Sequence, residues 1–464
     1  MSQIKELISE KCQLFEKIND DIWEYAETKF EEYNSCKAQI RLLEEEGFKV
    51  TKNLANIETA FYGSYGCGKP VIAVLGEFDA LPDLSQEADV FEKKATCNGG
   101  NGHGCGHNTL GAASLQAAVC IKDYIKKNNL NGTIRYYGCP GEENGGGKVF
   151  LVRDGYFDDV DFGVTWHPAS LNCVLNDGFL ANIKAIFNFK GVTSHAAASP
   201  ELGRSALDGL ELMNVGINFM REHMIDDARV HYAITNTGGI APNVVQANAQ
   251  GIYNVRAPKL NQVIELFERV KNIAKGAALM TDTTVDYKIT AGYSDYIANS
   301  TLSKIMEKHA KDILEKVEYT EEEYEYASKI QSTFKEELVS TTKIFNYNNS
   351  TECIPIVKNL FPAPKKIPGS SDVGDVSWVI PMAQFSGSCY AFGTPAHSWQ
   401  LVSQGKSSIA HKGMKNAALV MALTVIEVLE NSKLLDQIKK DHEEKLNGSS
   451  YVCPIDDTVK PFIS

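Results

Sequence analysis

Apolar residues gather in three short runs in the first half of the chain, and each run leads into residues that can ionise or bind a metal. The runs and the residues that follow them are 70–78 with Asp79, 132–138 with Glu142 and Glu143, and 161–166 with His167. Apolar runs of this length are typical of strands that are buried on both faces of a sheet. We therefore expect a sheet that carries functional side chains at the ends of its strands.

Helical patterns lie between these runs, at residues 110–127 and 148–153, and the chain begins with an amphipathic pattern over residues 1–10. Strands that alternate with helices predict an α/β domain. We expect a mixed sheet with helices on both of its faces.

Near residue 181 the pattern changes to alternating apolar and polar positions, which is typical of a half-buried strand. The predicted elements that follow are strand 183–191, helix 204–221, strands 231–235 and 251–256, helix 260–277 and strand 284–290. This order predicts a small α+β domain, residues 181–295, inserted into a larger domain made of residues 1–180 and 296–464. Residues 318–335 form an acidic, tyrosine-bearing helical pattern, which we interpret as a solvated helix face and not as an interaction patch.

Composition and charge indicate where the protein acts and which partners it does not bind. The chain has 464 residues, a formal net charge of −13 and 11 cysteines without paired spacing. Reduced thiols of this kind are typical of a cytosol, and the N-terminus has no signal-peptide pattern, so we expect a cytoplasmic protein. The acidic charge disfavours nucleic acid as a partner, and no apolar run is long enough to span a membrane.

The glycine-rich segment 98–107 contains three potential metal ligands within five residues, His103, Cys105 and His107. Imidazole nitrogen and thiolate sulfur are ligands that borderline-soft divalent metals prefer. Cys105 and His107 are separated by one residue, so on a strand-like or turn backbone both can point toward one ion. On this segment alone, a reactive or buried cysteine beside a loop histidine remains an alternative.

Glu142 and Glu143 are adjacent carboxylates in a glycine-rich loop, where neighbouring side chains diverge. One carboxylate can bind metal while the other acts as a general base, although a solvated acidic turn is the alternative. His167 is a further candidate ligand, or else a structural histidine after a strand.

Toward the C-terminus, His397 follows a Gly-Thr-Pro-Ala turn and is our candidate for the closing ligand. His411 is the competing histidine, but its context is that of a basic helix start. Asp79 follows the first buried strand, where a carboxylate commonly accepts the distal N–H of a metal-binding imidazole and fixes its tautomer. We assign Asp79 that supporting role.

Taken together, the motifs of this chain resemble those of one superfamily. They are Gly-Glu-Phe-Asp-Ala-Leu-Pro from Gly76, Gly-His-Gly-Cys-Gly-His-Asn from Gly102, Gly-Glu-Glu-Asn-Gly-Gly-Gly from Gly141, Trp-His-Pro from Trp166, Ser-His-Ala-Ala-Ala-Ser-Pro from Ser194, Gly-Arg-Ser-Ala-Leu-Asp from Gly203, Pro-Asn-Val-Val-Gln from Pro242 and His-Ser-Trp-Gln from His397. The chain is similar to the co-catalytic metallopeptidases and amidohydrolases, which include aminoacylases, hippurate hydrolases and plant indoleacetyl-amino-acid hydrolases. The motifs span nearly the whole chain in order.

The resemblance implies a site with two divalent ions per subunit, Mn²⁺ or Zn²⁺. The residues that match the family's metal ligands are Cys105, His107, Glu143, His167 and His397. Glu142 matches the general base, and His195 matches a histidine that a small dimerisation or lid domain supplies to the partner subunit's active site. Asn243 and Arg256 fall where relatives contact substrate. The implied assembly is a homodimer or a heteromer with a paralogous subunit.

The implied reaction is hydrolysis of the amide bond of small N-acyl amino acids, p-aminobenzoyl-glutamate or related dipeptides by a water activated between two metals. Two alternatives stay open: an amidase with Cys105 as nucleophile, which needs no metal, and a paralogous subunit without turnover. Two features depart from many relatives. Asn108 stands where these carry Asp, and residues 314–366 form a longer segment than in hippurate hydrolases.

Overall fold

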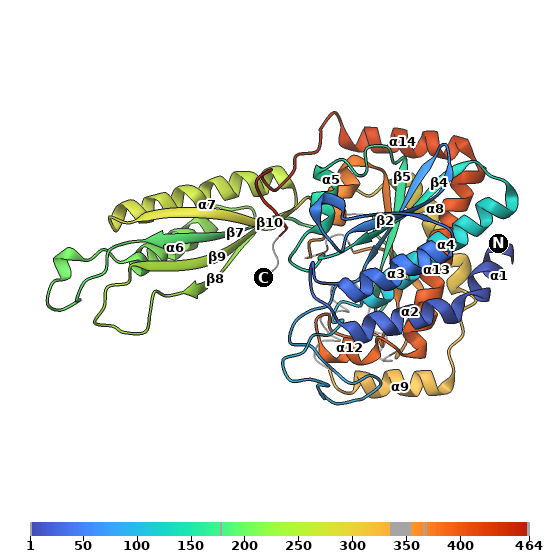
Figure 1. Ribbon diagram of the computed structural model, residues 1–464, viewed down its shortest axis with the longest axis horizontal. Coiled ribbons are helices and arrows are strands. Elements are labelled where there is room, and N and C mark those ends of the chain that lie inside the picture. The colour runs from blue at the N-terminus through green and yellow to red at the C-terminus, as the bar shows by residue number, and fades with distance from the viewer. Residues whose placement is uncertain (1, 177–178, 335–353, 365–366, 368, 462–464) are drawn as a thin grey trace.

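The computed structural model describes residues 2–176, 179–334, 354–364, 367 and 369–461. Within these ranges the strands form two sheets, one of eight strands and one of four (Figure 1). We call residues 181–293, which build the four-stranded sheet and its helices, the lid, and the remainder the catalytic body. In the described part of the chain, no helix is both long enough and apolar enough to cross a bilayer.

The sheet of the catalytic body is mixed, as predicted, and has the strand order β1-β2-β4-β3-β5-β12-β6-β11. The strands are β1 (Lys49–Lys52), β2 (Phe61–Cys67), β3 (Val71–Glu77), β4 (Gly132–Cys139), β5 (Phe162–Ala169), β6 (Asn172–Val174), β11 (Leu360–Phe361) and β12 (Met382–Ser388). β3 lies parallel between β4 and β5, and every residue of β3 is buried. The three apolar runs of the sequence are therefore three neighbouring parallel strands, whose carboxyl ends lie at one edge of the sheet.

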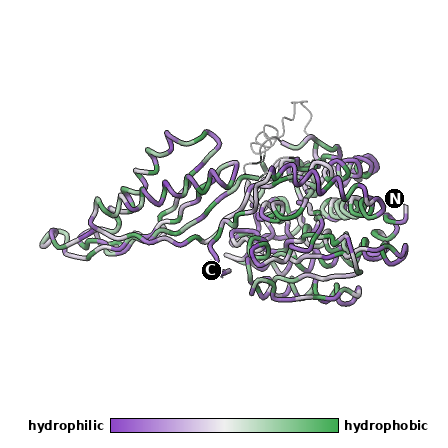
Figure 2. The backbone as a smooth tube through the Cα atoms, turned by 90° about the horizontal axis from the view of Figure 1, so that it is seen from above, coloured by the Kyte–Doolittle hydropathy of each residue, from purple (hydrophilic) through white to green (hydrophobic). Residues whose placement is uncertain are grey.

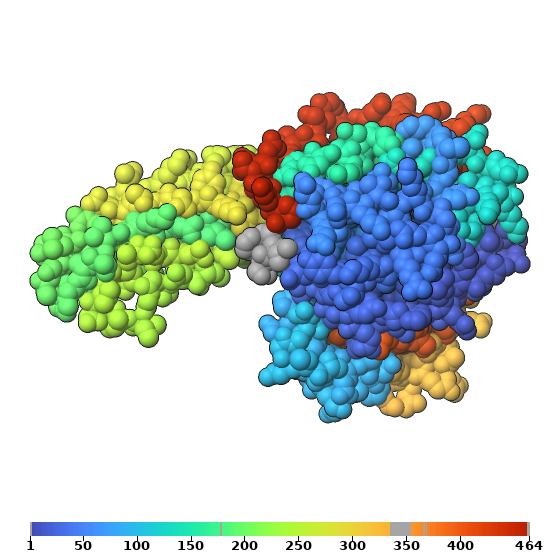
Figure 3. Space-filling model, in the orientation of Figure 1, coloured from blue at the N-terminus to red at the C-terminus, as the bar shows by residue number. Residues whose placement is uncertain are grey.

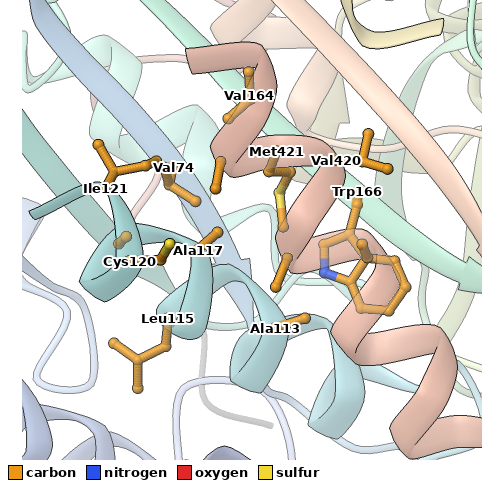
Figure 4. Packing of buried hydrophobic residues seen from close by; sticks show 14 of the residues in the cluster. Val74, Ala113, Leu115, Ala117, Cys120, Ile121, Val164, Trp166, Val420 and Met421 are labelled. Atoms are coloured by element: carbon orange, nitrogen blue, oxygen red, sulfur yellow. The ribbon is translucent and has the colours of Figure 1, made fainter. Parts of the chain in front are cut away.

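Helices cover both faces of this sheet, which confirms the predicted fold class. One layer contains α1 (Ser2–Glu10), α2 (Cys12–Tyr25), α3 (Tyr33–Glu45), α4 (His107–Asn128), α8 (Ser300–Leu314) and α13 (Ser408–Glu430), and the other contains η1 (Leu54–Asn56), α5 (Gly147–Arg153) and α11 (Val373–Val379). Figure 4 shows small side chains such as Ala113 and Ala117 of α4 between larger residues of α13 and the sheet. Small residues let α4 lie close to β3, which fixes the start of α4 at the strand ends.

The lid consists of an antiparallel sheet with two helices on one face, as Figure 2 shows from above. Its elements are β7 (Ala181–Lys190), η2 (Pro200–Leu202), α6 (Ala206–Arg221), β8 (Arg229–Asn236), β9 (Asn248–Ala257), α7 (Leu260–Met280) and β10 (Thr284–Tyr293). The strand order is β10-β7-β9-β8. The order of strands and helices along the chain is the predicted one, while the role of the lid in pairing two subunits stays a prediction.

One predicted detail differs from the structure. The helix expected over residues 318–335 is shorter: α9 spans Glu321–Gln331. Thr320 is its N-cap residue and forms a capping box with Glu323. Within the described residues, three helices follow His397: α12 (Trp399–Gln404), α13 and α14 (Ser432–Leu446). The last residue of that predicted helix, 335, lies outside the described residues. So do residues 335–353 and 365–366 of the longer segment 314–366.

Candidate metal centre

The loop before α4 brings Cys105 and His107 to the carboxyl ends of the parallel strands. Gly106 between them has a φ of +77°, a left-handed conformation that glycine adopts without steric cost, and α4 begins at His107. The Cys105 Sγ lies 3.5 Å from Nε2 of His167, which comes from β5. Nδ1 of His167 lies 2.8 Å from the Pro168 carbonyl, so Nε2 is the nitrogen that faces the thiol.

His107 is fully buried between two carboxylates that β3 and the residues after it supply. Its Nδ1 lies 2.9 Å from Oδ1 of Asp79, the partner that the sequence suggested for a ligand histidine. Its Nε2 has no hydrogen-bond partner among the described residues and lies 3.3 Å from a carboxylate oxygen of Glu77. A buried ring nitrogen without a hydrogen bond is costly unless another ligand satisfies it, as a metal ion does.

The acidic loop after β4 places Glu142 and Glu143 apart, as their adjacency predicts. Oε1 of Glu143 lies 3.0 Å from Nε2 of His397, and the Glu143 amide donates to Asp79 at 2.9 Å. The Glu142 side chain turns instead toward Glu77 and His107. The lid contacts this loop, because the Tyr293 hydroxyl donates to the Glu142 carbonyl at 3.2 Å.

A backbone contact brings His397 to the site across a long stretch of sequence. The amide of His397 donates to the Gly104 carbonyl at 2.8 Å, and His397 itself has a left-handed φ of +55°. Its side chain is half exposed at the rim, in contrast to the buried His107. His411, the competing histidine, does not lie in this site. It is in the first turn of α13, and its Nε2 is 2.9 Å from Oδ1 of Asp20.

Among the described residues, three groups have ligand atoms that all lie within 4.8 Å of one another. The groups are Cys105 with His107 and His167, Cys105 with Glu143 and His397, and Glu77 with His107 and Glu142. The first two share Cys105 and together contain all five predicted ligands. This set of one thiol, three imidazoles and one carboxylate fits divalent ions such as Zn²⁺ or Mn²⁺.

The electrostatics favour a thiolate at this position. Burial and the charge of Glu143 oppose ionisation of Cys105, but His107 and His167 outweigh them and hold the pKa of the thiol well below its ordinary value. Conversely, burial disfavours a charged His107, yet Cys105 and Asp79 raise the pKa of this imidazole. Burial and the neighbouring carboxylates, led by Glu77, raise the pKa of Glu142 well above its ordinary value.

Glu77, Lys148 and Asp372 form a buried ionic network behind the site that sequence reasoning missed. The Lys148 ammonium lies 2.7 Å from Glu77 and 2.5 Å from Asp372, and all three side chains are almost completely inaccessible. Glu77 lies near the end of the first apolar run, and a carboxylate at that position could have indicated a role at the site. Nothing local to Asp372 indicates its role, because only the fold brings it to Lys148.

The structure does not bring four further candidates into this cluster. His103 turns away, and its Nε2 lies 3.0 Å from the Ile22 carbonyl. His195 is exposed beyond the end of β7, roughly 30 Å along that strand from the catalytic body. Asn243 lies beside it, since its carbonyl accepts from the Ala196 amide at 2.9 Å. Arg256 is half-buried near the opposite end of β9, at the base of the lid.

Comparison with known proteins identifies the class. The chain belongs to peptidase family M20/M25/M40, whose model matches residues 73–352. It is 45% identical to one subunit of the p-aminobenzoyl-glutamate hydrolase of Escherichia coli, over 99% of this chain and 98% of that protein. It is 26% identical to Xaa-Arg dipeptidase of Mus musculus, over 95% of this chain and 91% of that protein. The resemblance seen in the motifs is confirmed, and the chain is a hydrolase of amide or peptide bonds.

Other relatives cover less of the chain or share only its fold. A second, differently named subunit of the same E. coli hydrolase is 32% identical over 47% of this chain and 52% of its own length. A putative aminohydrolase from Staphylococcus aureus has a TM-score of 0.65 at 17% identity and covers 92% of this chain and 99% of its own. A dinuclear metal-binding M20 peptidase from Bacillus subtilis has a TM-score of 0.57 at 16% identity, over 90% and 99%. These structures show that the arrangement of body and lid is a known fold.

Proposed function

We propose that the chain is a metal-dependent amidohydrolase that cleaves small N-acyl amino acids, with p-aminobenzoyl-glutamate as the first substrate to test. The observation that carries the proposal is the pair of ligand groups that share the Cys105 thiol at the strand ends. The similarity to one subunit of p-aminobenzoyl-glutamate hydrolase over nearly the whole chain supports the choice of substrate.

Cys105, His107 and His167 would hold one ion, and Cys105, Glu143 and His397 the other. When bound, two divalent ions would polarise the amide carbonyl and lower the pKa of water to about 7. The thiolate and the imidazoles favour zinc and the carboxylate tolerates manganese, so we propose one of these two metals. Asp79 would hold the His107 ring in the orientation that directs Nε2 toward the ion.

Glu142 is the group that would move the proton. Its raised pKa makes the carboxylate a stronger base than an exposed glutamate, and it is in none of the ligand groups that contain Cys105. It would take a proton from the attacking water and return it to the leaving nitrogen, which must leave as an amine. The charge of His107 acts in the opposite direction and lowers the pKa of Glu142.

His195 would complete the site of a second subunit. Its Nδ1 accepts from the Ala197 and Ala198 amides at 3.2 and 3.1 Å, so the neutral ring carries its proton on Nε2. A donor of this kind stabilises the oxyanion of a tetrahedral intermediate. Because Asn243 lies beside His195, both would reach the partner's substrate, while Arg256 would hold a substrate carboxylate. The partner would be a second copy or a paralogous subunit, as the two differently named subunits of the E. coli hydrolase suggest.

An amidase that uses Cys105 as nucleophile is the second candidate, because the lowered thiol pKa and the 3.5 Å approach of His167 also suit that chemistry. Cys105→Ala separates the two. If Cys105 is a ligand, the purified variant retains fewer metal ions per chain than wild type, measured by elemental analysis. A variant with the full metal content and no turnover would favour the nucleophile.

The test of the proposal is release of free p-aminobenzoate from p-aminobenzoyl-glutamate, alongside a panel of N-acyl amino acids and dipeptides. We expect turnover with Mn²⁺ or Zn²⁺ and none after chelation. Glu142→Gln should keep its metal and lose about 10²- to 10⁴-fold in kcat. Glu10→Gln, at an exposed position of α1, is the matched control and should retain wild-type kcat. Turnover that survives chelation would refute the metal mechanism.

A further inference from the structure

The open face of the lid sheet carries positive charge at its base. Ile183 and Ala185 of β7 are buried under the lid helices, so Asn182 and Lys184 project from the opposite face. Asn182 pairs with Arg256 of β9 and Lys184 pairs with Asn254, which makes Lys184 and Arg256 diagonal neighbours on that open face. Figure 3 shows a gap between the lid and the catalytic body.

Lys184 bridges the lid and the acidic loop of the active site. Its Nζ donates to Oδ1 of Asn144 at 3.2 Å, and Asn144 directly follows the proposed ligand Glu143. The backbone at Lys29, in the catalytic body, lies beside the same loop. The residue before it, Thr28, forms a bridge with Ala80, and the Phe30 ring after it packs against Gly141 and Gly145.

Three other cations of the lid face carboxylates. Lys190 lies 3.1 Å from Asp286, Arg204 lies 2.6 Å from Asp282 and Lys259 lies 2.8 Å from Asp295. In the described part of the chain, the partner of Lys184 is instead a neutral amide, and no carboxylate lies within ion-pair distance of its ammonium. Half-burial, together with Lys29 and Arg256, lowers the pKa of Lys184. Like charges held together in this way attract an anion strongly.

We propose that Lys184 and Lys29 form a subsite for a side-chain carboxylate of the substrate, so that the enzyme selects N-acyl derivatives of acidic amino acids. The inference rests on the proposed amidohydrolase function and adds its substrate class. Arg256 lies next to this subsite and, with its planar fork, suits the α-carboxylate, while two ammonium groups suit the second carboxylate as point charges. The same cations repel a basic side chain, which argues against the specificity named for the Xaa-Arg dipeptidases.

The experiment compares p-aminobenzoyl-glutamate with p-aminobenzoyl-glutamine, which differ in one charge and hardly in size. For each we measure kcat/KM with the metal-loaded enzyme, and the dissociation constant with metal-loaded Glu142→Gln by calorimetry. We expect wild type to prefer the glutamate compound. Lys184→Gln should reduce that preference about 10-fold or more, with Lys29→Gln acting in the same direction. The loss should fall on the glutamate compound alone.

Two control variants distinguish a role of Lys184 in substrate binding from a role in holding the lid. Lys190→Gln removes a lid cation of the same face that is paired with Asp286, and it should leave the preference unchanged. Asn144→Gly keeps the left-handed φ of +63° and removes the hydrogen bond to Lys184, so it also should retain the preference. If Lys184→Gln weakens both compounds equally and Asn144→Gly copies it, Lys184 is a latch for the lid and the subsite is refuted.

The two proposals fail in different ways. If wild type hydrolyses both compounds without preference, or if Lys184→Gln retains the full preference, the subsite is wrong while the amidohydrolase stands. If wild type binds the compounds with a charge preference that Lys184→Gln loses but releases no p-aminobenzoate, the subsite stands and the proposed reaction is wrong. If it neither binds nor hydrolyses either compound, both are wrong for this substrate class.

Discussion

At the scale of single residues, two histidines of one motif have opposite environments. His107 is buried beside Asp79, with its remaining nitrogen directed at the ligand cluster. His103 is equally buried, but its Nε2 lies 3.0 Å from the Ile22 carbonyl and its Nδ1 has no hydrogen-bond partner among the described residues. Burial, with the neighbouring His107, lowers the pKa of His103 to about 4. The local sequence does not distinguish these two roles, since each histidine follows a glycine and lies two residues from Cys105.

The low pKa of His103 predicts how stability depends on pH. The unfolded chain binds a proton at this residue below about pH 6.5, whereas the folded chain binds it only below about pH 4. The unfolded state therefore binds more protons between these values, and the free energy of unfolding falls as the pH is lowered through this window, by about 3 kcal/mol at most. We expect His103→Gln, which keeps a donor for the Ile22 carbonyl, to have a flatter pH dependence.

Urea unfolding of chelated wild type and His103→Gln at pH 7 and pH 4.5 measures this difference. Other groups titrate over the same range in both proteins, so the comparison between the two isolates His103. An equal loss of stability in wild type and variant on acidification would show that His103 is protonated in the folded chain.

At the scale of elements, the start of α4 depends on Gly106. A Cβ at this position would lie 2.1 Å from the Tyr390 hydroxyl and 2.8 Å from Pro168, and the φ of +77° disfavours any side chain. We expect Gly106→Ala to lower the free energy of unfolding by at least about 1–2 kcal/mol. It should also weaken metal binding, because the proposed ligands Cys105 and His107 flank the strained residue. Thermal unfolding and metal titration measure the two effects.

Gly276 provides the matched control, since it lies within α7 and a Cβ there meets no atom within 4 Å. Gly276→Ala should stabilise the lid by about 0.5–1 kcal/mol and leave metal binding unchanged. If Gly106→Ala has the same effect as this control, the turn before α4 tolerates a side chain and its glycine does not position the ligands.

The elements were largely predictable from the sequence and the contacts between them were not. The apolar runs indicate β3, β4 and β5 because burial on both faces leaves a continuous pattern, and the alternation after residue 181 indicates the lid strands. The Glu77, Lys148 and Asp372 network was missed, because Lys148 and Asp372 are 224 residues apart in sequence. Only the packing of α5 against α11 brings them together.

At the scale of the whole molecule, the lid extends away from the catalytic body (Figure 1). β7 runs outward from Ala181 to Lys190, so the segment with His195 lies at the end of the lid far from the catalytic body of its own chain. Several large apolar side chains of the lid are exposed, among them Val215 and Phe219 of α6 and Ile234 of β8. An apolar surface on an extended domain indicates a protein partner, and our proposal requires that partner to receive His195.

Complementation between two inactive variants tests this arrangement. His195→Ala and Glu142→Gln should each lose most activity as separate proteins. In a mixed dimer, the site with an intact Glu142 receives His195 from its Glu142→Gln partner, so one of the two sites is complete. After unfolding and refolding of an equal mixture, half of the dimers are mixed, and we expect about one quarter of wild-type activity. The single variants refolded alone are the controls. If the mixture stays at their level, then His195 does not act across the dimer, and a lid that closes on its own catalytic body becomes the arrangement to test.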